Sequence, residues 1–150
     1  MEITRLDQLM EKYGGDPSAL IAILQDIQRE EGYLPYQTLT QLSGKMEVPL
    51  SRIYALATFY RSFSLKPTGR HKIGVCLGTA CHVRGGQAVL DRLERDLEVR
   101  AGNTTTNHRF TLETVRCLGC CSIGPVVRVD HETFGRVRQD KMAKILSRFE

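Results

Sequence analysis

Four of the five cysteines stand in two close pairs in the second half of the chain. Cys76 and Cys81 have four residues between them, and Cys117 and Cys121 have three. Residues 82–116 separate the two pairs. A close pair of thiolates can bind one metal atom, and two pairs supply the four ligands of a zinc site or of an iron–sulfur cluster. These side chains are therefore the candidates for metal binding.

Three kinds of chemistry compete for these cysteines. Zinc accepts four thiolates, but the pairs of a zinc site commonly have two intervening residues. Thiol–disulfide exchange is disfavoured because no C-x-x-C follows the first predicted strand, and Cys117 and Cys120, which have that spacing, lie far downstream. The longer spacings favour an iron–sulfur cluster and leave zinc binding and thiol chemistry as alternatives.

Two neighbouring residues are rival ligands. Cys120 directly precedes Cys121, and adjacent side chains on an extended backbone diverge, so we expect only one of them to face the metal. His82 follows Cys81 and could serve in a Rieske-type site. Because four cysteines already satisfy two tetrahedral irons, we expect His82 to pack or to form a hydrogen bond at the surface instead.

The elements that position the cysteines begin after a predicted linker, Lys66-Pro67-Thr68-Gly69. Strands are predicted at 73–75, 110–114, 126–129 and 135–137, helices at 86–97 and 140–149, and a polar loop at 101–107. This order predicts an α/β fold with a four-stranded mixed sheet covered by helices, which is the thioredoxin-like order. Both cysteine pairs then lie on loops that follow strands, so we expect their sulfurs near the surface.

The part before the linker is predicted to be helical. Asp16-Pro17 is an N-terminal capping signal, apolar residues recur at helical spacing from Leu20 to Ile27, and Gly32 ends the segment. Two further helices are predicted, one from Tyr36 to Ser43 and one from Pro49 to Tyr60. We therefore expect an N-terminal helical arm of about three helices, residues 1–69, and a thioredoxin-like domain, residues 70–150.

Composition and charge exclude several classes of protein. With 41% hydrophobic and 25% charged residues, the chain is typical of globular domains. No apolar run reaches the roughly 18 residues of a membrane-spanning helix, and residues 1–7 do not resemble a secretory signal, so we expect a cytoplasmic protein without membrane insertion. Residues 70–150 carry a net charge of +5, but their basic residues are scattered singly, which disfavours nucleic-acid binding.

The two cysteine motifs resemble those of the thioredoxin-like [2Fe–2S] ferredoxin family. The motifs are Cys76-Leu77-Gly78-Thr79-Ala80-Cys81-His82-Val83-Arg84-Gly85 and Cys117-Leu118-Gly119-Cys120-Cys121. The similarity extends to Glu31-Gly32-Tyr33-Leu34-Pro35, to Ile53-Tyr54-Ala55-Leu56-Ala57-Thr58-Phe59-Tyr60 and to Phe134-Gly135-Arg136-Val137. It thus covers nearly the whole chain, from about Leu20 to the C-terminus.

The resemblance implies a ligand set for a [2Fe–2S] cluster. Cys76 and Cys81 would bind one iron, and Cys117 and Cys121 the other. The resemblance assigns Cys121 rather than Cys120, which is then expected to be a small buried apolar residue. Members of the family include the 24-kDa subunit of respiratory complex I and the small subunits of NAD(P)-linked hydrogenases and formate dehydrogenases.

The implied function is one-electron transfer within a multisubunit NAD(P)H-linked oxidoreductase, which can lie at a membrane through its other subunits. The implied partners are a flavoprotein subunit, which carries FMN, the NAD(P)(H) site and a [4Fe–4S] cluster, and further iron–sulfur subunits. No residue of this chain is expected to act as nucleophile, acid or base. A free-standing ferredoxin and a zinc-stabilised interaction module remain as alternatives, and the sequence does not choose among the parent complexes or between NAD and NADP.

Overall fold

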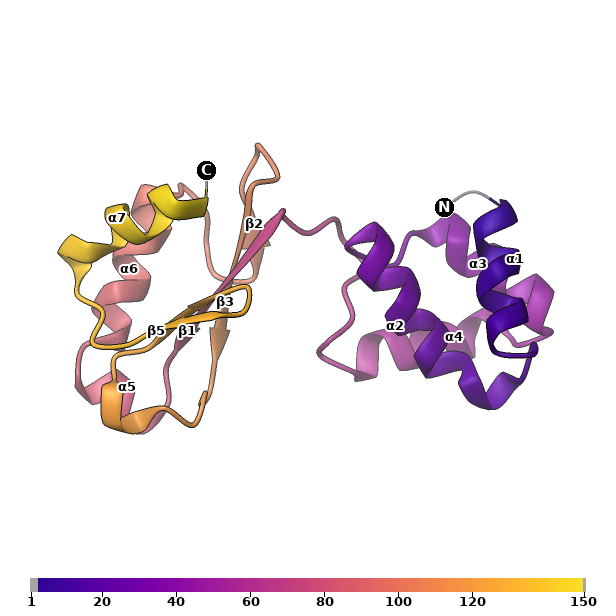
Figure 1. Ribbon diagram of the computed structural model, residues 1–150, viewed down its shortest axis with the longest axis horizontal. Helices are drawn as coiled ribbons and strands as arrows, with labels where there is room; N and C mark the ends of the chain where they lie inside the picture. The colour runs from indigo at the N-terminus through magenta and orange to yellow at the C-terminus, as the bar shows by residue number, and fades with distance from the viewer. Residues whose placement is uncertain (1–2, 150) are drawn as a thin grey trace. The chain divides into compact units, whose positions relative to one another are not determined.

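The computed structural model describes residues 3–149, with side chains from Arg5 onward. The chain divides into two compact units, Met1–Pro67 and Thr68–Glu150. The first contains only helices and the second contains the sheet (Figure 1). Within residues 3–149, no helix has the length and apolar character needed to span a membrane.

The first unit contains four α-helices in its described residues, where about three were predicted. They are α1 (Ile3–Lys12), α2 (Leu20–Glu31), α3 (Tyr36–Met46) and α4 (Leu50–Phe59), with a short 3-10 helix at Pro17–Ala19 before α2. The additional helix, α1, buries Leu6 and Leu9 against the same core as α2. These leucines have helical spacing, but two apolar positions in so short a helix are a weak sequence signal.

The predicted ends of the helices are partly correct. The Asp16 carboxylate accepts hydrogen bonds from the Ser18 backbone N–H (2.8 Å) and hydroxyl (2.6 Å), and Gly32 ends α2 with a left-handed φ of 79°. The predicted end of α3 at Gly44 is wrong, because the helix continues to Met46. A glycine inside a helix costs about 1 kcal/mol relative to alanine, and the burial of Met46 offsets this.

The second unit contains a five-stranded mixed sheet in the order β2-β3-β1-β4-β5 (Figure 1). Its strands are β1 (His71–Cys76), β2 (Asn103–Thr104), β3 (Phe110–Val115), β4 (Val127–Val129) and β5 (Glu132–Phe134). β1 and β3 are parallel, whereas the other neighbouring strands are antiparallel. The predicted α/β class with a mixed sheet is confirmed.

Two strands differ from the prediction. The fifth strand, β2, lies in the segment that was predicted to be a loop, and the Thr104 and Thr111 hydroxyls are hydrogen-bonded (2.8 Å) across the β2–β3 pair. So short a polar strand at the sheet edge has no alternating pattern to reveal it. The predicted strand at 135–137 is wrong in position: β5 ends at Phe134, before that range, because Asp130, with φ 52°, allows a tight turn directly after β4.

Helices complete the core of the second unit. They are α5 (Thr79–Val83), α6 (Gly86–Asp96) and α7 (Met142–Leu146), with 3-10 turns at Cys121–Ile123, Gln139–Lys141 and Ser147–Phe149. Leu93 of α6 and Met142 of α7 are fully buried in one core with Ile73 of β1 and Leu112 of β3. The helices thereby hold β1 and β3, the two strands that lead to the cysteines.

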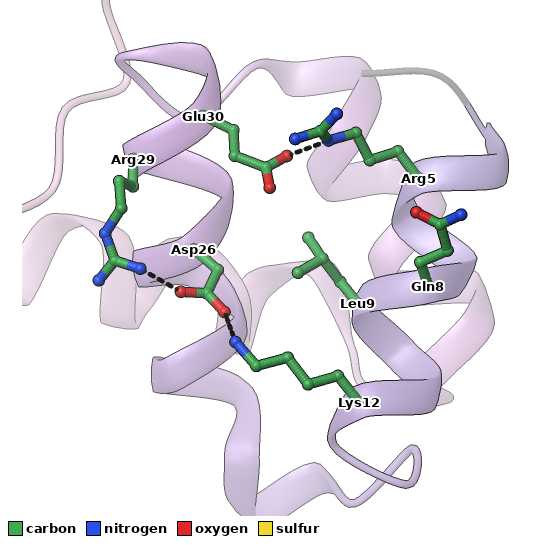
Figure 2. A pocket seen from close by; sticks show the side chains of 7 residues that line it. All are labelled: Arg5, Gln8, Leu9, Lys12, Asp26, Arg29 and Glu30. Atoms are coloured by element: carbon green, nitrogen blue, oxygen red, sulfur yellow. Dashed lines mark hydrogen bonds and ion pairs between the residues drawn. The ribbon is translucent and has the colours of Figure 1, made fainter.

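A buried carboxylate joins α1 to α2 in the first unit. Asp26 is 7% exposed and accepts hydrogen bonds from Lys12 Nζ (2.7 Å), Tyr13 Oη (2.8 Å) and Arg29 Nη1 (2.7 Å). Figure 2 shows Lys12 reaching Asp26 from the facing helix, with the Arg5–Glu30 pair one turn away. The hydrogen bonds from Lys12 and Tyr13 hold the pKa of Asp26 below its ordinary value, although burial acts in the opposite direction.

We expect Asp26→Asn to destabilise the first unit by about 1–2 kcal/mol at pH 7, because exposed cations lose a buried anionic partner. A carboxylate with a lowered folded-state pKa stabilises the fold above its unfolded pKa of about 3.9 and loses this effect as the pH falls through the folded-state value. The difference in the free energy of unfolding between wild type and Asp26→Asn should therefore disappear below about pH 4. Urea unfolding of the cluster-free protein, followed by circular dichroism at pH 7 and pH 3, measures this difference. An equal difference at both pH values would contradict the role given to the Asp26 carboxylate.

The same variant tests the division of the chain. We propose that the helical unit and the sheet unit are independent domains that correspond to the predicted ranges 1–69 and 70–150. Asp26→Asn should then speed amide hydrogen exchange in α1 and α2 and leave β1, β3 and β4 unchanged. Acceleration of equal size in both units, measured by mass spectrometry, would show instead that they unfold together.

Candidate metal centre

The parallel pairing of β1 with β3 brings the two cysteine segments together. Cys76 is the last residue of β1 and pairs with Val115, the last residue of β3. Beyond the strands, the Leu77 backbone N–H still donates to the Val115 carbonyl at 2.8 Å. Cys117 follows two residues later, so both loops leave the sheet at the same edge.

The two cysteines of each pair lie in different types of local structure. In the first loop, Cys76 ends a strand and Cys81 lies in the short helix α5. In the second loop, Cys117 lies in irregular chain and Cys121 begins a 3-10 turn. The helix α5 was not predicted, and its single turn explains how a spacing of four intervening residues returns Cys81 toward Cys76.

The four cysteines that the sequence singled out line one open hollow of about 520 Å³. The other lining residues are Leu77, Gly78, Thr79, Ala80 and Arg116. Cys120 and His82 are absent from this lining. The structure thus brings together the residues predicted as ligands and leaves both rivals outside.

The two pairs differ in depth. Cys76 and Cys81 are each 2% exposed, whereas Cys117 and Cys121 are exposed to solvent. The hollow therefore has one sulfur pair at its inner wall and one at its mouth. The expectation that the sulfurs lie near the surface holds for the second pair and is wrong for the first, because Cys76 and Cys81 pack against Val126.

Backbone N–H groups surround the sulfurs. Burial raises the pKa of the Cys76 thiol, but hydrogen bonds from the Gly78 and Leu118 N–H groups and the contact with Cys81 outweigh it, so that the pKa is lowered. The Val126 N–H approaches Cys81, and the Gly119 N–H lies 3.3 Å from Cys117 Sγ. Such donors stabilise negative charge on thiolates and raise the potential of a bound cluster.

Within each pair the thiols are in mutual contact. Burial, followed by the contact with Cys76, raises the pKa of Cys81, and the contact with Cys117 raises the pKa of Cys121. A second thiolate in a pair is unfavourable because it repels the first. A metal cation between the two sulfurs removes this repulsion, so the donor set fits a metal-bound state.

The arrangement of the sulfurs in two pairs fits a dinuclear centre. A [2Fe–2S] cluster needs two thiolates at each iron, and the hollow is lined by two pairs of cysteines. Among residues 3–149, no group of three or more His, Cys, Asp or Glu side chains is placed to hold a single metal ion.

Glycines allow the close approach of the loops. A Cβ on Gly78 would lie 2.4 Å from the Arg116 carbonyl oxygen, and one on Gly86 would lie 2.8 Å from the Cys76 carbonyl oxygen. Neither contact is sterically possible, so these positions require glycine. Gly85, with φ 102°, lets α6 begin directly beside both cysteines of the first loop.

Cys120 is held away from the hollow. Its thiol donates to the Leu118 carbonyl at 3.5 Å, and its side chain packs against the small cluster of Cys76, Cys81 and Val126 without lining the hollow. It is partly buried rather than fully buried as expected, because it lies in the same surface loop as the exposed Cys121.

Comparisons with known proteins agree on one family. The model of the thioredoxin-like [2Fe–2S] ferredoxin family matches residues 6–150. The chain is 34% identical to the NADP-reducing hydrogenase subunit HndA of Solidesulfovibrio fructosivorans, over 95% of this chain and 83% of that protein. It is also 34% identical to a subunit of the NADH-quinone oxidoreductase of Rickettsia conorii, over 96% of this chain and 88% of that protein.

Solved structures support the fold. An NAD⁺-reducing [NiFe]-hydrogenase in the air-oxidised state contains a region similar to 87% of this chain, with a TM-score of 0.73 and 22% sequence identity. The match covers 22% of that hydrogenase chain, and at this identity it speaks for the fold alone. From the match of the family model over nearly its whole length, together with the two relatives, the chain belongs to the thioredoxin-like [2Fe–2S] ferredoxin family.

Proposed function

We propose that this chain is the [2Fe–2S] electron-transfer subunit of a multisubunit NAD(P)H-linked oxidoreductase. The observation that carries the proposal is the hollow lined by two thiol pairs, one buried and one exposed. In this proposal Cys76 and Cys81 hold one iron, and Cys117 and Cys121 hold the other. The bound cluster accepts and releases single electrons.

The protein's own groups prepare the site for that chemistry. The buried pair excludes water from the inner wall, and the N–H groups of Gly78, Leu118 and Gly119 offset negative charge on the sulfurs. The exposed pair leaves a short path to another redox centre. No acid, base or nucleophile is needed for this function, because no proton or covalent bond has to be exchanged with a substrate.

The relatives indicate the kind of complex. HndA is a subunit of an NADP-reducing hydrogenase, and the Rickettsia relative belongs to an NADH-quinone oxidoreductase. By analogy, the partner of this chain is a flavoprotein subunit with FMN, an NAD(P)(H) site and a [4Fe–4S] cluster, together with further iron–sulfur subunits. Purification of the tagged chain from its own cells, followed by NAD(P)H reduction of the isolated material, tests this. A coloured chain that purifies alone and is not reduced would favour a free-standing ferredoxin.

The ligand assignment predicts opposite results for two adjacent cysteines. Cys121→Ala should lose most of its iron and acid-labile sulfide, because one iron is left with a single thiolate. Cys120→Ala, the matched control, should keep the content and visible absorption of the unmodified protein, because Cys120 lies outside the hollow. Iron and sulfide analysis after anaerobic purification measures both. A colourless Cys120→Ala protein would overturn the assignment, and zinc in place of iron in the unmodified protein would overturn the function.

The close packing around Gly78 predicts that a larger residue there weakens the binding of the cluster. Gly78→Ala should lose the cluster several-fold faster than the unmodified protein, because its Cβ would meet the Arg116 carbonyl, and such overpacking costs about 1–3 kcal/mol. Gly44→Ala is the control, since its Cβ meets nothing within 4 Å and alanine favours the helix. The decay of visible absorption in air gives the rates. Equal rates in both variants would show that the loop accommodates a side chain.

A further inference from the structure

An arginine joins the two cysteine loops. Arg84 directly follows α5, the helix that holds Cys81. Its Nη1 donates to the Cys121 carbonyl at 2.8 Å and lies 3.4 Å from the Ser122 carbonyl. One side chain from the first loop therefore holds the backbone of the second loop at the residue proposed as a ligand.

The stem of Arg84 lies beside the sulfur of the buried pair. At Gly124, the position that a Cβ would occupy is 3.6 Å from Arg84 Cδ, 3.1 Å from Cys81 Sγ and 3.4 Å from the Cys121 carbonyl oxygen. All three atoms thus lie around one buried glycine. Arg84 Cδ is therefore within about 7 Å of Cys81 Sγ, while the guanidinium group is hydrogen-bonded to the backbone at Cys121.

The two cysteine segments supply no carboxylate to balance this charge. Residues 76–90 and 114–129 contain no Asp or Glu. Among the described residues, Arg84 is in no ion pair, in contrast to Arg92, which pairs with Asp96. Four thiolates with a cluster carry a net negative charge that grows on reduction, so a nearby cation stabilises the reduced state more than the oxidised one.

We propose that Arg84 is a positioning residue that holds the Cys121 loop against the Cys81 helix and that its charge raises the reduction potential of the cluster. The inference rests on the proposed function, because it requires a cluster at these cysteines. It assigns two separable effects to one side chain: the hydrogen bond to the loop controls how firmly the cluster is held, and the positive charge controls its potential.

Three variants separate the effects. Arg84→Gln removes the charge and keeps a donor, Arg84→Lys keeps the charge and changes the donor, and Arg84→Ala removes both. Arg95→Gln is the matched control, because exposed Arg95 on α6 also donates to a backbone carbonyl, that of Asp91 at 3.3 Å, but bonds within its own helix and not to a cysteine loop. The measurements are iron and sulfide content, the midpoint potential, the electron paramagnetic resonance spectrum of the reduced protein, and the rate of cluster loss.

Arg84→Gln should lower the reduction equilibrium constant by up to about tenfold, which is 59 mV for one electron, and the difference should shrink at high salt because Arg84 is exposed. Arg84→Lys should restore most of the potential. Arg84→Ala should show the fastest cluster loss. Arg95→Gln should match the unmodified protein in all four measurements.

The proposal would be overturned if Arg84→Gln had the potential and spectrum of the unmodified protein, or if Arg95→Gln shifted the potential equally. These failures differ from failure of the proposed function. An unmodified protein that contains no iron refutes the proposed function. If the unmodified protein contains iron but the Arg84 variants have its midpoint potential, only the role of Arg84 is refuted. If Arg84→Ala does not assemble a cluster, the Gln and Lys variants still decide the charge effect.

Discussion

The parallel contact between β1 and β3 is the constraint on which the site depends. Residues 82–116 separate the two cysteine pairs, and these strands remove that separation by ending side by side. Leu93 and Met142 press on the same strands from the helices that cover them. A change that shifted the register of β1 against β3 would move Cys76 away from the second loop. The packing of the sheet core therefore determines the positions of the sulfurs.

Close backbone packing is the second requirement. The N–H groups that approach the sulfurs come from loops in which a side chain at Gly78 or Gly86 would collide with a carbonyl oxygen. The same closeness that positions these donors makes the loops intolerant of larger residues. Arg84 adds a side-chain hydrogen bond between the two loops, beyond the ends of the paired strands β1 and β3.

The sequence was informative where its signals were local. The capping residue Asp16, the terminating Gly32 and the alternating residues of β1, β3 and β4 each mark an element by short-range chemistry. The α/β class and the convergence of four cysteines followed from these elements and their order. The cysteine spacing alone left iron, zinc and thiol chemistry open, and the resemblance to a family was needed to choose among them.

Features that depend on contacts between distant residues could not be predicted. β2 exists because Asn103 and Thr104 find a partner in β3, and α3 passes Gly44 because Met46 has a core to enter. The bond from Arg84 to Cys121 joins residues 37 positions apart and leaves no periodic trace in the sequence. Sequence patterns report which faces are apolar, but they do not report which loops meet.

The unequal burial of the two sulfur pairs makes the two halves of the site differ in their access to solvent. The inner pair is enclosed by β1, the start of α6 and Val126. Cys117 and Cys121 are exposed. If the four cysteines hold a cluster as proposed, the iron bound by the second loop would lie nearer to solvent than the iron bound by the first, and a redox centre in another protein would find its shorter approach along the segment from Cys117 to Ile123.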